Sequence, residues 1–135
     1  MKYLKLNLVF LLVLFLFSSC SMFRELKENS AREKTVKENQ SKIEVGMSKD
    51  ELTKLLGTPC NVQFDEKNEA LQYCYTTAYD DKLMHNHYVV VWLSDGVVTG
   101  MTTYNDISSD FCINGFQSVY WENSHGYLIE RRRWK

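Results

Sequence analysis

Residues 46–59 have the sequence GMSKDELTKLLGTP, which carries the start, the apolar face and the stop of one short helix. Ser48 occupies the position of an N-cap and Glu51 follows three residues later, so the two residues are expected to form a capping box. The apolar face consists of Leu52, Leu55 and Leu56. Gly57 then supplies the residue type that most often ends a helix. The stretch therefore predicts a helix over residues 49–56.

Downstream of this helix the apolar pattern changes to that of β-strands. The segments rich in β-branched and aromatic residues are 61–64, 70–77, 88–93, 97–102 and 117–121. Asp95-Gly96 lies between two of them and is typical of a two-residue hairpin turn. Since strands and helices do not alternate, we expect an α+β fold. One or two N-terminal helices would pack on one face of a 3–5-stranded antiparallel meander sheet.

The first twenty residues have the pattern of a bacterial lipoprotein signal. Lys2 and Lys5 form a charged region, residues 8–17 are an unbroken apolar run, and Ser18-Ser19 directly precede Cys20. The run is too short to cross a bilayer, which takes roughly 20 apolar residues, but it suits a secretory signal. We therefore expect Cys20 to be lipidated and to become the mature N-terminus. The alternative is an ordinary secretory signal that ends near a cysteine.

The rest of the chain is predicted to hold one small domain. A signal for retention in the inner membrane would have Asp directly after the lipidated cysteine, whereas this chain has Ser21. We therefore expect an outer-membrane anchor and a domain that faces the periplasm. The predicted parts are a signal peptide (1–19), a polar tether that is partly helical at most (20–42), the α+β domain (43–122) and a basic tail (123–135).

The charge balance argues against a nucleic-acid partner. The chain has 16 basic and 17 acidic residues, which become 14 and 17 once Lys2 and Lys5 leave with the signal. Nucleic-acid-binding proteins normally carry a concentrated basic face. The one basic cluster here is Arg131-Arg132-Arg133, which we interpret as an exposed tail. Contact with anionic headgroups or with an acidic partner is the alternative.

Three cysteines remain beside the predicted lipidation site. An exported protein folds where disulfides form, so one bridge and one free thiol are expected. A Cys60–Cys74 bridge is feasible across the first hairpin. A bridge between Cys60 and Cys112 is also possible. We favour Cys74 with Cys112, leaving Cys60 free, because residues 106–115 have little regular pattern and such a bridge would hold them on the sheet.

No set of residues points to catalysis, to a metal or to a cofactor. His85-Asn86-His87 lacks a third ligand and is expected in a solvated loop, with His125 far along the chain. Cys60 could act as a nucleophile only with His85 or His87 as its base, and a leftover thiol is the preferred interpretation. The paired carboxylates, which are typical of loops, are Asp80 with Asp81 and Asp106 with Asp110. We predict a protein that is not an enzyme.

The segments Ile43–Leu52 and Leu55–Pro59 resemble the signature of the SmpA/OmlA (BamE-like) small outer-membrane lipoproteins. In that family a Gly-Met-Ser/Thr turn opens the helix and Leu-Leu-Gly-Thr-Pro closes it. The resemblance implies helices on one face of a sheet, as in the repeats of β-lactamase inhibitory protein. It also implies a role in assisting the assembly of outer-membrane barrels. The family pattern does not include Cys74, Cys112 or the Arg-rich end.

The aromatic residues of the strands bear on function. They are Tyr73, Tyr75, Tyr79, Tyr88, Trp92, Tyr104, Tyr120 and Trp121. Most are expected in the core, and any that lie on a helix-free face of the sheet would form a protein-binding surface. We predict a non-catalytic envelope lipoprotein that scaffolds or modulates an outer-membrane complex, barrel assembly being one such role. The alternative is a periplasmic inhibitor or regulator of a hydrolase that uses its sheet face.

Overall fold

The computed structural model describes residues 23–114, 119 and 121. The chain divides into two compact units, Met1–Ala31 and Arg32–Lys135. In the first unit the described residues are helical, and Nε of Arg24 lies 3.2 Å from Oε1 of Glu28, one helical turn later. The predicted signal peptide, Cys20 and the basic tail lie outside the described residues. The sheet and the short helix belong to the second unit.

The helix α2 (Lys49–Leu56) begins and ends where the sequence predicts. The hydroxyl of Ser48 accepts a hydrogen bond from the backbone N–H of Glu51 at 3.3 Å, and the Glu51 carboxylate accepts one from the backbone N–H of Ser48 at 2.8 Å. These bonds complete the predicted capping box. The backbone bond from Ser48 and the contact with its hydroxyl lower the pKa of Glu51 from its ordinary value. Gly57 follows the helix at φ 79°.

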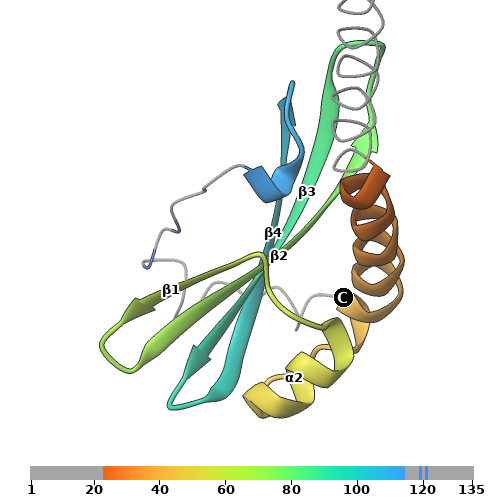
Figure 1. The fold of residues 1–135 in the computed structure, drawn as a ribbon. Coiled ribbons are helices and arrows are strands. Elements are labelled where there is room, and N and C mark those ends of the chain that lie inside the picture. The colour runs from red at the N-terminus through yellow and green to blue at the C-terminus, as the bar shows by residue number, and fades with distance from the viewer. Residues whose placement is uncertain (1–22, 115–118, 120, 122–135) are drawn as a thin grey trace, which may run out of the picture. The chain divides into compact units, whose positions relative to one another are not determined.

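The sheet is a four-stranded antiparallel meander in which every strand pairs with the next one along the chain (Figure 1). The strands are β1 (Asn61–Asp65), β2 (Asn68–Ala78), β3 (Met84–Ser94) and β4 (Val97–Ser108). The β3–β4 turn has positive φ at both central residues, Asp95 (50°) and Gly96 (77°), as the tightest hairpins require. The predicted α+β meander is therefore confirmed.

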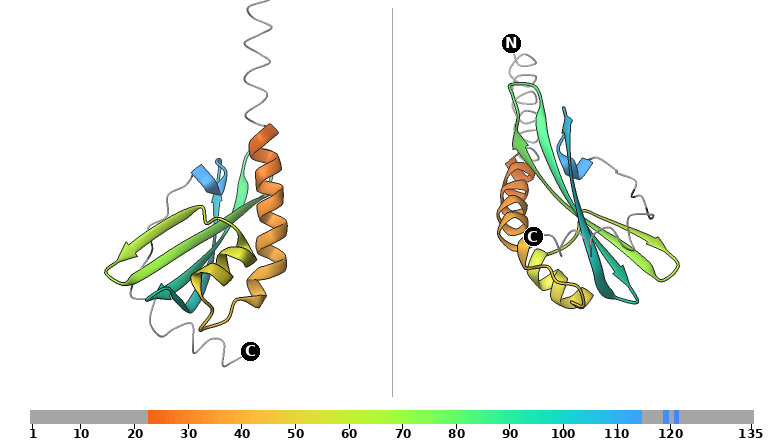
Figure 2. Two further views of the ribbon diagram at one scale, coloured as in Figure 1. Left: turned by 60° about the horizontal axis from the view of Figure 1, so that its bottom comes forward. Right: turned by 180° about the vertical axis from the view of Figure 1, so that it is seen from behind.

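One face of the sheet is covered by α2 and by the helical residues 32–39 (Figure 2). Alternate residues of the strands meet the helices there, as the two-residue period of a strand requires. The buried residues of this main core are Val36, Ile43, Leu52, Leu56, Leu71, Tyr73, Tyr75, Val89, Val91, Leu93 and Val98. Leu55 is half-buried at the rim of the same core.

The other face of the sheet is also covered, which corrects the expectation of an open aromatic face. Ala70, Val90 and Trp92 are buried there, and Val119 and Trp121 pack against them. The rings of Trp92 and Trp121 meet edge to face with their centroids 5.5 Å apart. The aromatic residues at this end of the face are therefore used for internal packing.

The segment predicted to be a polar tether is helical. Residues 23–39 form a continuous helix, and Gln40–Lys42 (η1) add a 3-10 turn. Val36 is 2% exposed because it fills a place in the main core beside Ile43. The folded unit therefore begins before residue 43, where the sequence analysis put its start.

The C-terminal part of the domain also differs from the prediction. Residues 106–114 are more regular than expected, because β4 continues to Ser108 and Cys112–Asn114 (η2) form a 3-10 turn. A strand over residues 117–121 is not observed at its two described positions, Val119 and Trp121. At these two positions the chain packs on the sheet without forming a fifth strand.

Candidate functional site

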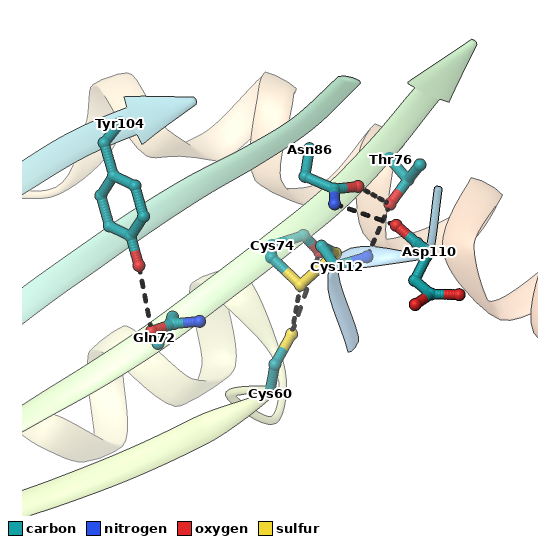
Figure 3. Close-up of a disulfide and its surroundings, with 8 residues drawn as sticks. All are labelled: Cys60, Gln72, Cys74, Thr76, Asn86, Tyr104, Asp110 and Cys112. Atoms are coloured by element: carbon teal, nitrogen blue, oxygen red, sulfur yellow. Dashed lines mark hydrogen bonds between the residues drawn. A yellow bond between two sulfur atoms is a disulfide. The ribbon is translucent and has the colours of Figure 1, made fainter. Parts of the chain in front are cut away.

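The three cysteines of the domain gather beside the start of β1. The structure joins Cys74 to Cys112, the pairing that the sequence analysis favours, with 6.1 Å between their Cα atoms. Both residues are buried. Cys60 carries a free thiol, and its Sγ lies 3.1 Å from the Sγ of Cys74 (Figure 3). One half-buried thiol and one buried disulfide thus share a single cluster, which we name the sulfur cluster.

A buried polar network holds the far end of the disulfide on the sheet. The hydroxyl of Thr76 donates a hydrogen bond to the Asn86 side chain at 2.7 Å and accepts one from the backbone N–H of Cys112 at 3.0 Å. The Asn86 amide donates to the carbonyl of Asp110 at 3.0 Å (Figure 3). Since Thr76 and Asn86 are buried, these bonds form away from solvent and fix residues 110–112 against β2 and β3.

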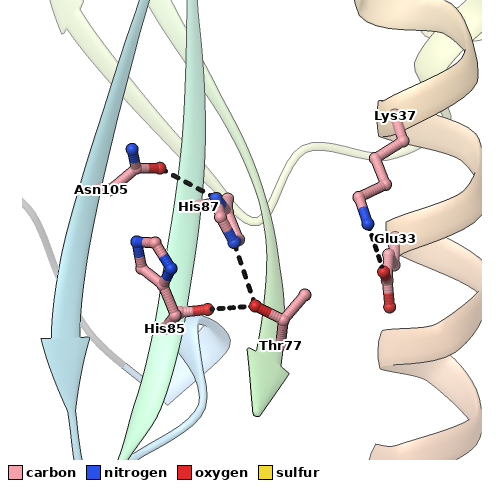
Figure 4. Close-up of polar contacts among 6 residues, drawn as sticks. All are labelled: Glu33, Lys37, Thr77, His85, His87 and Asn105. Carbon is pink, nitrogen blue, oxygen red and sulfur yellow. Dashed lines mark hydrogen bonds and ion pairs between the residues drawn. The ribbon is translucent and has the colours of Figure 1, made fainter. Parts of the chain in front are cut away.

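The two histidines predicted in a solvated loop lie instead in β3. The rings of His85 and His87 have centroids 4.2 Å apart, and His87 also stacks on Tyr75 at 4.6 Å. Nε2 of His87 lies 3.1 Å from the Thr77 hydroxyl, and Nδ1 lies 2.9 Å from Oδ1 of Asn105 (Figure 4). Partial burial lowers the pKa of His87 from its ordinary value. Both ring nitrogens of His87 therefore lie within hydrogen-bond distance of a neighbouring side chain.

A hollow of about 200 Å³ lies beside these rings on the helix-covered face. Its lining residues are Gln40, Tyr75, His87, Tyr88, Val89, Thr103 and Asn105. Lys37 stands nearby, with its Nζ 5.4 Å from the centre of the Tyr75 ring and 2.7 Å from a carboxylate oxygen of Glu33 (Figure 4). The lining contains no serine, cysteine or carboxylate, and its one histidine, His87, has both ring nitrogens near Thr77 and Asn105.

The nucleophile–base pair considered from the sequence does not form. The thiol of Cys60 contacts Cys74, whereas the His87 ring stacks on Tyr75. Cys74 and Tyr75 are consecutive residues of β2, so their side chains lie on opposite faces of the sheet. Among the described residues, no group of three His, Cys, Asp or Glu side chains could hold a metal ion.

The carboxylates singled out in the sequence occupy structural positions. Oδ1 of Asp80 accepts hydrogen bonds from the backbone N–H groups of Lys82 and Leu83, at 2.8 and 2.7 Å, and so shapes the turn between β2 and β3. Asp106 lies within β4, and Asp110 contributes its backbone carbonyl to the network with Asn86.

The most prominent exposed apolar surface on the sheet is its first strand. Of the described strands, β1 pairs with β2 alone and is therefore an edge. Val62 is 36% exposed and Phe64 is 66% exposed, and both point to the same side because they are two residues apart. Edge strands are usually protected by charge, proline or a bulge. Residues 61–64 contain no charge or proline, and Asp65 is the one charged residue of the strand. The side chain of Gln63 accepts a hydrogen bond from the backbone N–H of Val119 at 3.4 Å. We name Val62 and Phe64 the β1 edge.

The sequence predicts this strand but not the exposed position of Phe64. The available signal was the absence of a charged residue between positions 61 and 64. Such a run is equally typical of a strand covered on both sides, so the pattern alone does not reveal an edge. Pairing with a single neighbour is what identifies it.

No family model, curated protein or solved structure matches this chain. The resemblance to the SmpA/OmlA lipoproteins therefore stays a prediction. Within residues 23–114, no helix is long and apolar enough to cross a membrane. The predicted lipidation site, Cys20, and His125 lie outside the described residues.

Proposed function

We propose that this chain is a non-catalytic envelope lipoprotein whose domain binds a partner protein along the β1 edge. The observation that supports the proposal is the aromatic side chain of Phe64, 66% exposed on an edge strand whose one charged residue is the terminal Asp65. A strand of the partner laid along β1 would pair with its backbone and cover Phe64, which is the mode of β-strand addition. Aromatic residues are enriched in such contacts.

The anchor in this proposal rests on the sequence. A lipid on Cys20 would hold the chain at the outer membrane, provided that more than one acyl chain is attached, because one chain gives only marginal binding. The partner would then be a component of an outer-membrane complex, such as the barrel-assembly machinery of the lipoproteins that this chain resembles. The chain would act as a scaffold or modulator of that complex.

Site-specific photocrosslinking tests the partner surface. A photoreactive residue at position 64 should yield a crosslinked partner in intact cells, whereas the same residue at the exposed position 54 on α2 should not. Crosslinks from position 64 to outer-membrane barrel-assembly proteins would support the scaffold. Crosslinks to a cell-wall or periplasmic hydrolase would favour an inhibitor instead, and equal crosslinking from both positions would refute the β1 edge as the binding surface.

The anchor is tested separately with Cys20→Ala. We expect this variant to keep its leader or to leave the membrane fraction, because the residue that carries the lipid is gone. Mass spectrometry of the mature N-terminus and fractionation of membranes report both outcomes. A variant with unchanged mass and unchanged fractionation would show that Cys20 is not the anchor.

A further inference from the structure

The sulfur cluster places a free thiol directly against a disulfide. Sγ of Cys60 lies 3.1 Å from Sγ of Cys74, which is itself bonded to Cys112 (Figure 3). Disulfides exchange when a thiolate attacks one of the two bonded sulfur atoms. Here the attacking atom and the atom attacked are already in contact within the folded protein.

We propose that the three cysteines form an intramolecular thiol–disulfide exchange centre, in which Cys60 displaces Cys112 from Cys74. Cys60 first gives its proton to a solvent base, and the thiolate then forms a new bond to Sγ of Cys74. The Cys74–Cys112 bond breaks, its electron pair leaves on Sγ of Cys112, and that thiolate takes up a proton. One disulfide and one thiol are present before and after, so the step needs neither an oxidant nor a reductant.

The backbone beside β1 fits the second pairing. The backbone N–H of Cys60 donates to the carbonyl of Gln72 at 2.7 Å, and Asn61 is the ladder partner of Gln72. Cys60 is thus held alongside β2 within one or two residues of Cys74. When the register is continued, Cys60 lies opposite Tyr73 and one residue away from the position that faces Cys74. The two Sγ atoms nevertheless meet at 3.1 Å, which is the contact that a new S–S bond requires. The Cys60–Cys74 bridge can therefore form without moving either strand far.

The exchange would change how the C-terminal part of the domain is attached. In the Cys74–Cys112 form, η2 is bonded covalently to β2. In the Cys60–Cys74 form, residues 110–112 would be held through the hydrogen bonds of Thr76 and Asn86, without the covalent bond. The bridge would instead tie the start of β1 to β2. The exchange therefore moves the covalent constraint from one end of the cluster to the other.

The surroundings of Cys60 set the rate. Burial raises the pKa of the Cys60 thiol, while a backbone contact with Cys74 and the positive charge of Arg32 act in the opposite direction. Burial, and then the charge of a Cys60 thiolate, raise the pKa of Tyr73 to about 12. Because the thiolate is the attacking species, exchange is slow near neutral pH and should speed up about tenfold for each unit of pH below the thiol pKa.

Peptide mapping distinguishes the two pairings directly. Trypsin cuts after Lys54, Lys67, Lys82 and Arg131, which leaves each cysteine on its own peptide: 55–67, 68–82 and 83–131. The full-length oxidised protein is incubated at pH 7 and at pH 9 with a thiol-alkylating reagent and digested without reduction. We expect label on Cys112 to appear faster at pH 9, together with linked peptides 55–67 and 68–82. Circular dichroism verifies that the protein stays folded at both values.

The Cys60→Ser variant is the matched control, since it keeps the Cys74–Cys112 bridge and removes the attacking thiol. Label on Cys112 should be absent from it. The proposal is overturned if wild-type protein at pH 9 is labelled on Cys60 alone, or if the Cys60→Ser variant labels Cys112 as fast as wild type does. A Cys112→Ser variant should contain linked peptides 55–67 and 68–82 after air oxidation, and two alkylated cysteines in that folded variant would also overturn it.

Discussion

The replacement of Leu52 by alanine tests how α2 is docked on the sheet. Leu52 is 0% exposed in the main core. Loss of a buried leucine side chain costs about 2–5 kcal/mol of unfolding free energy, and the cost is highest where the surroundings do not collapse into the cavity. Near Leu52 the chain is pinned to the β3–β4 hairpin. The backbone N–H of Lys49 bonds to the carbonyl of Gly96 at 3.0 Å, and that of Val98 bonds to Met47 at 2.8 Å.

These bonds keep the helix from sliding into the cavity, so we expect the upper half of the range, about 3–5 kcal/mol. Leu55→Ala should cost less, about 1–2 kcal/mol, because Leu55 is half-buried. Lys54→Ala on the exposed side of the helix should stay within about 0.5 kcal/mol of wild type. Urea unfolding followed by tryptophan fluorescence measures all three, since Trp92 is buried.

The order of unfolding free energies among the three variants tests whether α2 is docked through Leu52. A Leu52→Ala protein within about 1 kcal/mol of Lys54→Ala would refute the docking of α2 described above. The slope of unfolding free energy against urea concentration should be the same for all variants, which separates a loss of stability from a change in compactness.

Three further predictions concern single groups. Glu51→Gln should remove a pH dependence of stability. The Glu51 carboxylate stabilises α2 above its ordinary pKa of 4.5, and this stabilisation is lost as the pH falls through the lower pKa that Glu51 has in the folded protein. The unfolding free energies of the two proteins in urea should therefore become equal in acid. Tyr73→Phe should be neutral or stabilising by up to about 1 kcal/mol, because the buried Tyr73 hydroxyl has no hydrogen-bond partner in the described structure. Burial raises the pKa of Tyr73 to about 12, so absorbance titration of this variant should lose a late-ionising tyrosine. The double variant Cys74→Ala with Cys112→Ala should lose about 4 kcal/mol for a closed loop of 38 residues, and wild type should unfold like it once reductant is added.

Local chemistry explains why much of the fold could be predicted. The ends of α2 depend on Ser48, Glu51 and Gly57, whose roles act within a few residues. The β3–β4 turn likewise follows from Asp95-Gly96, because that dipeptide accepts the positive φ values of the tightest hairpin. Each of these signals lies within a few consecutive residues, so it can be recognised without knowing the rest of the structure.

The parts that could not be predicted depend on contacts between distant segments. The segment 23–39 lacks an apolar stripe, and the core position of Val36 emerges only when Ile43 and the sheet are in place. The exposure of Phe64 depends on β1 having a single neighbour, which no pattern within β1 records. The contact between Cys60 and the bridged Cys74 depends on how β1, β2 and the segment that carries Cys112 come together, which no pattern near Cys60 records.

The order of the strands has a consequence for how the domain folds. Because each strand pairs with the next one, the sheet is assembled from turns that close over short stretches of chain. Closing a short loop costs less conformational entropy than closing a long one, and domains rich in such local contacts fold quickly. A chain that enters an oxidising compartment unfolded could thus form β2, β3 and β4 before Cys74 meets Cys112. Refolding of the reduced protein, followed by stopped-flow fluorescence, should therefore proceed at nearly the rate of the oxidised protein.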